Sequence, residues 1–541
     1  MFTSPYPDVE IPNISIYDSL FGTLTPEDAG RVALVDPGDG AETTFEQLRA
    51  QVDAFGGALA ARGVEVGTVL GVLCPNIPAF ATVFHGALRI GATLTTINSL
   101  YTAAEIATQL RDAQATWLIT VSPLLPQAAQ AAATVGIPDE RLIVLDGAAG
   151  HPNLGELLRA GESAPEVEFD PATHIAVLPY SSGTAGEPKG VMLSHRNLVA
   201  NVEQSRAIID VTPEDRVLAV LPFFHIYGMT VLLNLALRQR ARLVTMPRFD
   251  LVDFLETIQR FGCTYIFIAP PIAVALAKHP IVDDYDISSV RTILSGAAPL
   301  DAETGEAAAR RLHARMLQGY GMTEMSPVSH VIPPESTDIP VSSIGVLIPN
   351  QEAKLIDVAT GIEITDTGPE GVSAPGELWV RGPNIMLGYL GRAQDTGETI
   401  DADGFLHTGD VAVYHAGGYF SIVDRVKELI KYKGYQVAPA ELEAVLLLHP
   451  HIADAAVIGV NDEDGQEIPK AYVVRAPQVP LSEAEVIAHV GAHVAPYKKV
   501  RAVQFVEQIP KSSSGKIMRR ELRALPTARP GAASVDNERG M

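Results

Sequence analysis

The chain has 541 residues, 47% of them apolar and 19% charged, so it is long enough for several domains with a large buried core. Forty Lys and Arg residues against 64 Asp and Glu residues give a net charge of −24, which disfavours nucleic acids and anionic membranes as partners because both would be repelled.

Two isolated cysteines, Cys74 and Cys263, argue against a disulfide framework or a zinc site and fit a reducing compartment. The start of the chain lacks a signal-peptide pattern, and the apolar segment 264–277 is too short to span a membrane. We therefore expect a cytoplasmic protein without a transmembrane segment.

Helix-like and strand-like segments alternate along the first part of the chain. Residues 44–63 have helical spacing behind a Thr44–Gln47 capping-box pattern, and strand-like 68–74, helix-like 79–91 and strand-like 93–97 follow. Short apolar runs that end in Pro or Gly recur at 216–223, 264–270 and 290–296. This alternation predicts an α/β fold with parallel, doubly wound sheets.

The pattern changes twice toward the C-terminus. After about Ser342, short alternating strands such as "GELWVRG" predict a small antiparallel β subdomain. Beyond the boundary, a helix at 439–449, strands at 454–460, 470–475 and 501–506, and a helix capped by Ser482 and Glu485 predict a small α+β domain. We expect domains at 1–424 and 425–541, with a disordered tail at about 526–541.

The stretch "YSSGTAGEPKGVMLSH", from Tyr180 to His195, has the composition of a phosphate cradle. It matches neither the Walker loop nor the dinucleotide fingerprint. An apolar strand enters the loop and another leaves it, which predicts a flap between two strands. Its hydroxyls, glycine amides and one lysine suit a pyrophosphate, although a polar surface turn is the alternative for such a loop taken alone.

The loop is not alone, because "SSGTAGEPKGV" resembles the phosphate loop of the adenylate-forming superfamily, which includes acyl-CoA synthetases, luciferases and adenylation domains. Six further family motifs follow in the family order: "SGAAP", "QGYGMTE", "GELWVRG", "HTGD", "DRVKELIKYKGYQVAPAELE" and "PKSSSGKIMRREL". The resemblance covers essentially the whole chain, and its pattern is nearest to bacterial 4-coumarate–CoA ligase-like enzymes.

The resemblance implies a two-step reaction in which a carboxylate and ATP give acyl-adenylate and pyrophosphate, and coenzyme A then takes the acyl group. It implies Mg²⁺ as cofactor, a small C-terminal lid that moves between two catalytic faces, and a small carboxylic acid, ATP and CoA as partners. The implied catalytic residues are Lys516, Lys431, Gln436 and His225. The implied metal residue is Glu324, the hinge is Lys427, and the CoA contacts are Arg248, Lys433 and Gly434. The implied ATP contacts are Ser181, Ser182, Gly183, Thr184, Gly186, Lys189, Gln318, Gly319, Tyr320, Thr323, Asp410 and Arg425.

The implied acyl site is apolar and lined by small residues. Its residues are Ile226, Tyr227, Gly296, Ala297, Gly321, Pro327 and Val328. A flat slot of this kind favours hydroxycinnamate-like aryl acids, with medium- or long-chain fatty acids as the alternative. Luciferase-like oxidation of the adenylate, transfer to a carrier protein and a non-catalytic nucleotide-binding scaffold remain further alternatives.

Three positions depart from the family pattern. Ala185 replaces a threonine of the phosphate loop, which removes one hydroxyl contact worth about 1 kcal/mol. Trp379 stands where plant 4-coumarate–CoA ligases carry a cysteine, which favours a bacterial relative. Arg248 replaces a lysine, which keeps the charge and changes its geometry.

Overall fold

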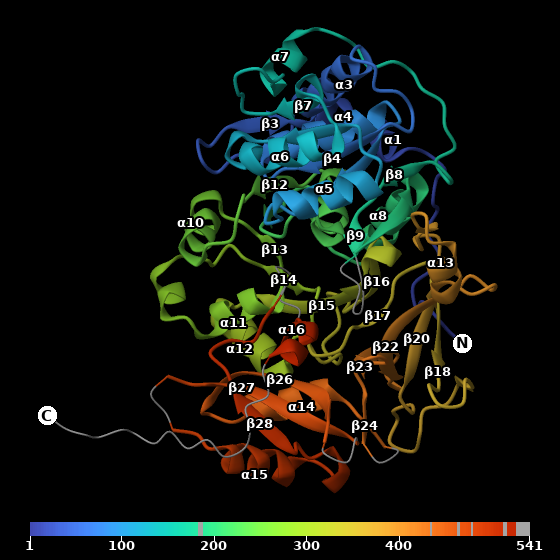
Figure 1. Cartoon of the computed structure of the whole chain (residues 1–541). Helices are drawn as coiled ribbons and strands as arrows, with labels where there is room; N and C mark the ends of the chain where they lie inside the picture. The colour runs from blue at the N-terminus through green and yellow to red at the C-terminus, as the bar shows by residue number, and fades with distance from the viewer. Residues whose placement is uncertain (182–187, 433–434, 463–465, 478–479, 512–516, 526–541) are drawn as a thin grey trace, which may run out of the picture. The chain divides into compact units, whose positions relative to one another are not determined.

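The structure is a computed structural model, and it describes residues 1–181, 188–432, 435–462, 466–477, 480–511 and 517–525 (Figure 1). The chain divides into two compact units. Unit 1 consists of Met1–Thr408 and Ala412–Ile422, and unit 2 of Gly409–Val411 and Val423–Met541. Each unit is described by itself.

Two large sheets form the centre of unit 1. The eight-stranded sheet has the order β21-β10-β8-β5-β4-β6-β7, with β9 paired to β10. Its strands are β4 (Val69–Leu73), β5 (Thr93–Thr96), β6 (Trp117–Thr120), β7 (Leu142–Val144), β8 (Ile175–Val177), β9 (Tyr180–Ser181), β10 (Lys189–Ser194) and β21 (Gly388–Tyr389). Strands β8, β5, β4, β6 and β7 run parallel, and β10 pairs antiparallel with β8, β9 and β21.

The nine-stranded sheet has the order β17-β16-β15-β14-β13-β11-β12-β2-β3. Its strands are β2 (Val32–Val35), β3 (Glu42–Thr44), β11 (Arg216–Ala219), β12 (Arg242–Thr245), β13 (Tyr265–Ile268), β14 (Thr292–Ser295), β15 (Arg315–Gly321), β16 (Val328–Val331) and β17 (Val346–Leu347). The six strands from β15 to β2 in this order are parallel to one another, whereas β16, β17 and β3 pair antiparallel with their neighbours. The predicted α/β fold with parallel sheets is therefore confirmed.

Helices connect the parallel strands, and local capping signals begin several of them. Helix α3 (Phe45–Ala60) starts at Thr44, whose hydroxyl accepts the Gln47 amide while the Gln47 side chain accepts the Thr44 amide, as the capping-box pattern predicts. The other helices of unit 1 are α1 (Ile16–Phe21), α2 (Pro26–Ala29), α4 (Pro78–Arg89), α5 (Ala103–Asp112), α6 (Leu125–Val135), α7 (Leu154–Arg159), α8 (His195–Arg206), α9 (Leu235–Arg238), α10 (Leu251–Phe261), α11 (Pro270–Lys278), α12 (Ala302–Leu312) and α13 (Ala393–Thr399).

The eight-stranded sheet buries a separate hydrophobic cluster on each face, because successive strand residues point to opposite sides. Ile119 packs with residues of α3 and α4, whereas its neighbour Leu118 packs with residues of α5 and α6. At Gly71 the approach of α5 leaves no room for a side chain, since a Cβ there would lie 2.5 Å from Cδ2 of Leu110. The core of unit 1 thus spans both faces of the sheet.

An antiparallel sheet follows the two parallel ones, as the change of pattern after Ser342 predicts. Its strands are β1 (Phe2–Thr3), β18 (Glu352–Ile356), β19 (Glu363–Ile364), β20 (Gly376–Arg381), β22 (Leu406–Tyr414) and β23 (Phe420–Arg425). Both cysteines of the chain are buried and free, as expected. In the part of the chain that is described, no helix combines the length and apolarity needed to cross a membrane.

Unit 2 has the predicted α+β pattern. Its strands are β24 (Ile430–Tyr432), β25 (Tyr435–Val437), β26 (Ile452–Asn461), β27 (Glu467–Arg475) and β28 (Ala502–Phe505), and its helices are α14 (Pro439–Leu447), α15 (Glu483–His493) and α16 (Arg519–Ala524). Helix α15 begins at Ser482 with the predicted Ser482–Glu485 capping box. The core of this unit includes Leu442 of α14, Val457 of β26 and Val486 of α15.

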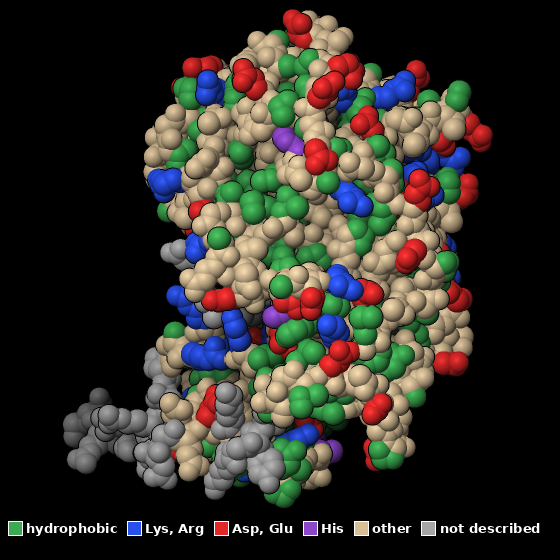
Figure 2. All heavy atoms as spheres, turned by 90° about the vertical axis from the view of Figure 1, so that its right-hand side faces the viewer, with side chains coloured by type: hydrophobic (Ala, Val, Ile, Leu, Met, Phe, Trp, Pro, Cys, Tyr) green, Lys and Arg blue, Asp and Glu red, His purple; other side chains and the backbone are tan. Residues whose placement is uncertain are grey.

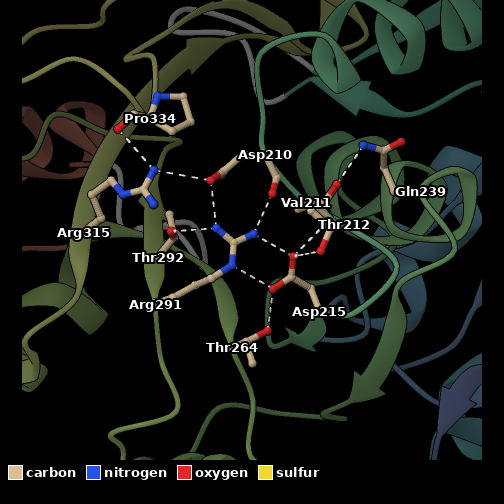
Figure 3. Close-up of polar contacts among 10 residues, drawn as sticks. All are labelled: Asp210, Val211, Thr212, Asp215, Gln239, Thr264, Arg291, Thr292, Arg315 and Pro334. Carbon is tan, nitrogen blue, oxygen red and sulfur yellow. Dashed lines mark hydrogen bonds and ion pairs between the residues drawn. The ribbon is translucent and has the colours of Figure 1, made fainter.

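A charged network joins the amino ends of four parallel strands of the nine-stranded sheet (Figure 3). Arg291, just before β14, donates to both carboxylate oxygens of Asp215 at 2.9 and 2.6 Å, and to Asp210 at 2.8 Å. Thr264, just before β13, donates to the same Asp215 carboxylate at 2.7 Å. Burial opposes ionisation of Asp215, but the bonds from Arg291, Thr264 and the Thr212 amide outweigh it and lower its pKa. The network therefore fixes strand ends that are far apart in the sequence.

We predict that Arg291→Met destabilises unit 1, because it leaves the Asp215 side chain, which is 4% exposed, without its cation. The expected loss of unfolding free energy is about 3 kcal/mol in denaturant titrations. Arg310→Met is the matched control, since the Arg310–Glu306 ion pair is mostly exposed, and it should cost less than about 0.5 kcal/mol. Equal losses in the two variants would contradict a stabilising network.

His85 is a buried titratable group in the core of unit 1. Neither ring nitrogen has a hydrogen-bond partner among the described residues, and the rings of Phe21 and Phe84 lie 5.6 and 5.0 Å away, centroid to centroid. Burial lowers the pKa of His85 to about 3. The folded protein therefore holds this imidazole neutral, while the unfolded chain takes up a proton below a pH of about 6.5.

The stability contributed by neutral His85 is present above about pH 6.5 and is lost as pH falls toward the folded-state pKa of about 3. We predict that His85→Leu removes this dependence, worth about 1.4 kcal/mol per pH unit below 6.5, and is at least as stable as the parent at pH 7. Unfolding free energies at pH 7, 6 and 5 measure both effects. His151→Leu, at a partly exposed loop position, should keep the parent slope. An unchanged slope in His85→Leu would contradict the assignment.

Candidate active site

The sequence motifs with implied chemistry gather at the carboxyl edge of the nine-stranded sheet. His225, Ile226 and Tyr227 follow β11, and Arg248 follows β12. Gly296 and Ala297 directly follow β14, whose last residue, Ser295, pairs in register with Gln318 of β15. In open parallel sheets, ligands bind outside the carboxyl ends of the strands. The sheet therefore brings together residues that lie almost 100 positions apart.

Tyr227 and Gly296 form one wall at this edge. The Tyr227 hydroxyl donates to the carbonyl oxygen of Leu294 at 3.1 Å, and a Cβ at Gly296 would lie 2.9 Å from the Tyr227 ring. The ring is thus held against the glycine, and burial raises the pKa of its phenol, which stays neutral. Only a residue without a side chain allows this contact.

The other implied acyl-site residues are mainly buried. Ile226, Pro327 and Val328 are buried, whereas Ala297 and Gly321 are exposed. A Cβ at Gly321 would lie 2.1 Å from the carbonyl oxygen of Pro327, so the two backbones are in close contact there. His225 is partly exposed, and its Nδ1 accepts the Tyr227 amide at 3.3 Å.

Tyr227 also begins an irregular helix that the sequence does not predict. Residues Tyr227–Asn234 form a π-helix before α9. Such turns are rare and frequently occur at functional sites. Apolar periodicity cannot distinguish a short π-helix from an α-helix, because the two differ only in that each backbone hydrogen bond of the π-helix reaches one residue further along the chain.

The motif "QGYGMTE" provides a buried carboxylate. Glu324, 5% exposed, lies in a short 3₁₀ helix at Thr323–Met325, and its carbonyl oxygen accepts the Met386 amide at 2.9 Å. Its Oε1 accepts a hydrogen bond from the Tyr389 hydroxyl at 2.8 Å. Asn384 donates to the carbonyl oxygen of Met325 at 2.6 Å and holds the same turn. A carboxylate in this setting is of the ligand type that Mg²⁺ prefers.

Three neighbours in the same motif differ in what they contact. The amide of Gln318 accepts from Leu300 and donates to the Ser343 carbonyl, both at 2.7 Å, so it supports the backbone around it. Gly319 and Tyr320 lie beside it on β15, and the Tyr320 ring lies 5.8 Å from that of His330. ATP contacts by Gln318, Gly319, Tyr320 and Thr323 stay predictions.

The phosphate loop has the predicted strand–loop–strand frame. Strands β9 and β10 pair with Lys189 opposite Ser181 and Gly190 opposite Tyr180. Lys189 makes an ion pair with Asp395 at 2.8 Å, and its ammonium lies 4.8 Å from the centre of the Tyr389 ring. Ser182, Gly183, Thr184, Ala185 and Gly186 lie outside the described residues.

Unit 2 contains Asp410 and Arg425, the two residues that the resemblance implies for binding the ribose of ATP. Arg425 Nε lies 3.0 Å from Oδ1 of Asp410, and the amide of Val426 donates to the Gly409 carbonyl at 2.8 Å. Lys427, the implied hinge, is exposed. Lys431 and Gln436 are paired opposite each other in β24 and β25. Lys433 and Gly434 lie outside the described residues.

The implied catalytic Lys516 also lies outside the described residues, but its loop has an ordered base. Lys511 and Ile517 form an isolated antiparallel bridge, and the Met518 amide donates to the Pro510 carbonyl at 2.9 Å. Arg519, two residues beyond the bridge, makes ion pairs at 2.7 Å with Glu443 and at 2.8 Å with Glu428. The ion pair with Glu428 ties Arg519 to the segment that follows Lys427.

Sequence reasoning missed Tyr389, Asp395 and Asn384. They lie between the motifs "GELWVRG" and "HTGD", in a stretch without a recognised pattern. Tyr389 contacts Glu324 and Lys189, Asp395 contacts Lys189, and Asn384 contacts the Met325 carbonyl, and no local spacing encodes these contacts. Trp379, by contrast, has a packing explanation, because its ring stacks on that of His407 with centroids 3.6 Å apart.

Comparison with known proteins identifies the family. A model described as "AMP-binding enzyme" matches residues 25–390, and one described as "AMP-binding enzyme C-terminal domain" matches residues 441–516. The chain is 40% identical to 4-coumarate–CoA ligase 2 of Nicotiana tabacum, over 97% of each chain. Among solved structures, it resembles an anthranilate CoA ligase, AuaEII, in complex with anthranoyl-AMP, with a TM-score of 0.86 and 27% identity over 95% of this chain and 98% of that one.

A benzoate CoA ligase from Burkholderia xenovorans LB400 gives a TM-score of 0.83 and 26% identity over 94% of this chain and 100% of that one. The family model covers more than half of the chain, and the sequence relatives cover nearly all of it. The chain therefore belongs to the AMP-binding, adenylate-forming enzyme family, and it is an AMP-forming acid–CoA ligase that uses ATP and CoA as substrates and works through an acyl-adenylate.

Proposed function

We propose that this ligase activates flat aryl acids of the hydroxycinnamate type. The observation that carries the proposal is the contact of the Tyr227 ring with Gly296, because it places an uncharged aromatic ring beside a residue without a side chain at the carboxyl edge of the sheet. The Tyr227 hydroxyl is engaged by Leu294, and Ile226 and Val328 add apolar surface. Relatives that act on coumarate, anthranilate and benzoate, by their names, support the same class.

The first step of the reaction brings a carboxylate to an α-phosphate, and both are anions. In a chain with a net charge of −24, the attraction must come from local cations and donors. We propose that Lys189 binds the phosphates with the hydroxyls and amides of Ser181, Ser182, Gly183, Thr184 and Gly186, and that Lys516 stabilises the reacting oxygens. Gln318, Gly319, Tyr320 and Thr323 would bind the adenine and α-phosphate, and Asp410 with Arg425 the ribose.

Mg²⁺ completes this proposal. Glu324 would hold the ion, which neutralises phosphate charge when bound.

For the second step, Lys431 and Gln436 would support thioester formation. Arg248, Lys433 and Gly434 would contact coenzyme A, and Lys427 would be the hinge between the two steps. His225 would contact the acyl group beside Ile226, Tyr227, Ala297, Gly321 and Pro327. A cytoplasmic location fits the two free, buried cysteines.

The substrate class is tested with a panel of cinnamic, coumaric and benzoic acids and C6–C16 fatty acids, incubated with ATP, Mg²⁺ and CoA. We expect thioester and AMP to form together and fastest with the aryl acids, and we expect Lys516→Ala to lose adenylation. Mass spectrometry of the thioester and AMP release are the measurements. Preference for a fatty acid would contradict the aryl assignment, and adenylate without thioester would point to another acceptor.

Gly296→Ala tests the wall directly. The added methyl group must displace the Tyr227 ring, since its position lies 2.9 Å from that ring. We expect kcat/KM for the preferred aryl acid to fall about tenfold or more, with the KM for ATP nearly unchanged. Gly30→Ala is the matched control because a Cβ there meets nothing within 4 Å. Equal kinetics in the two variants would remove the argument for a flat slot at Gly296.

A further inference from the structure

Tyr389 connects two groups that the proposed function assigns to ATP and its metal. It ends the short strand β21, which pairs antiparallel with β10, so Tyr389 lies opposite Val191 of the strand that begins at Lys189. Its hydroxyl donates to Glu324 Oε1 at 2.8 Å, and the face of its ring lies 4.8 Å from the Lys189 ammonium. One side chain therefore contacts both the phosphate-loop lysine and the buried carboxylate.

We propose that Tyr389 is a positioning residue for the adenylation step: its hydroxyl sets the orientation of the Glu324 carboxylate and its ring holds the Lys189 ammonium. The proposal rests on the proposed roles of Lys189 and Glu324. It concerns the half-reaction that uses ATP and not the one that uses coenzyme A. Both contacts are charge-assisted, and such contacts are stronger than those between neutral groups.

The surroundings of Tyr389 fix the position of its ring. Tyr389 is 7% exposed, and its amide donates to Thr396 Oγ1 at 2.9 Å. Gly388 before it has φ +141°, and a Cβ there would lie 2.7 Å from Cγ2 of Thr396, so the turn requires glycine. Burial and the neighbouring Glu324 raise the pKa of the phenol, which remains a hydrogen-bond donor. The hydroxyl thus has a defined direction before any ligand arrives.

Lys189 makes an ion pair with Asp395 in addition to its contact with the Tyr389 ring, and only the ion pair has to be broken when a phosphate binds. Asp395 lies 2.8 Å from the ammonium, and both side chains are about one-third exposed, at 29% and 31%. To bind Lys189, a triphosphate must displace the Asp395 carboxylate from the ammonium group. The ring contact is independent of that exchange, because a cation–π attraction acts through the ring face and leaves the N–H donors of lysine available.

Tyr389→Phe is the decisive variant, because it keeps the ring beside Lys189 and removes the bond to Glu324. We expect the Mg²⁺ concentration that supports half-maximal ATP binding to rise about tenfold, as measured by calorimetry without the acid. Acid-dependent exchange of pyrophosphate into ATP should slow by a similar factor. Conversion of a pre-formed acyl-adenylate by CoA should stay within about twofold of the parent rate.

Two further variants separate the contacts. Tyr389→Leu also removes the ring and should additionally weaken ATP binding through Lys189. Tyr6→Phe is the matched control: its hydroxyl donates to Glu335 Oε1 at 2.6 Å in the same unit, outside the described site. It should leave the binding and both half-reactions unchanged.

Two results would overturn the proposal. One is a Tyr389→Phe protein with the same Mg²⁺ dependence and exchange rate as Tyr6→Phe. The other is an equal loss in both half-reactions, which would indicate a purely structural role. If the parent protein activates none of the acids tested, the proposed substrate class fails, but the calorimetric comparison of ATP binding still decides the role of Tyr389.

Discussion

Coulomb repulsion between the acid and ATP is the constraint on which the rest of the site depends. A carboxylate must approach a triphosphate inside a chain with a net charge of −24, and at contact distance such repulsion is worth several kcal/mol in a partly buried site. The protein as a whole cannot supply attraction, so it must be local. That requirement explains why cations and glycine-rich backbone occur in a few short motifs, and why these motifs need a rigid support to bring them together.

The nine-stranded sheet supplies that support by separating two tasks between its edges. At the amino edge, Arg291 and Asp215 join the starts of the strands, and the Asp215 carboxylate accepts bonds from Thr264 and Thr212 as well. At the carboxyl edge, the loop after β14 begins with Gly296, and the loops of this edge carry the motif residues. Figure 2 shows acidic and basic side chains side by side over the face that it draws. The stabilising network and the proposed site thus lie at opposite ends of the same strands.

Features with a local cause could be predicted from the sequence. The capping boxes at Thr44 and Ser482, the alternation of helix and strand, and the change to antiparallel strands after Ser342 each depend on neighbouring residues, and each is found in the structure. The motifs indicated the family for the same reason, because each motif is a run of neighbouring residues. Tyr389 and Asn384 could not be predicted, because their partners Glu324 and Met325 lie about 60 positions away and nothing in "NIMLGYL" marks the contact. The π-helix at Tyr227 has the apolar pattern of an ordinary helix.

Buried polar side-chain atoms without a hydrogen-bond partner among the described residues occur at both edges of the sheet, at Tyr265 and Asp210 near the amino ends of the strands and at Ser295 at the carboxyl end of β14. Thr264 and Asp215 at the amino edge are hydrogen-bonded within the protein. Ser295, at the carboxyl end of β14, is fully buried, yet its hydroxyl has no partner among the described residues. An unpaired buried hydroxyl costs about 1–3 kcal/mol, and a well-packed sheet would replace Ser295 with alanine if stability alone decided. Local inconsistency of this kind is expected at functional sites, where polar groups serve a ligand or a moving segment. Ser295 directly precedes Gly296, so the cost of its hydroxyl falls beside the proposed site, while Asp215 at the opposite edge, with both carboxylate oxygens hydrogen-bonded, helps to supply the rigidity that allows it.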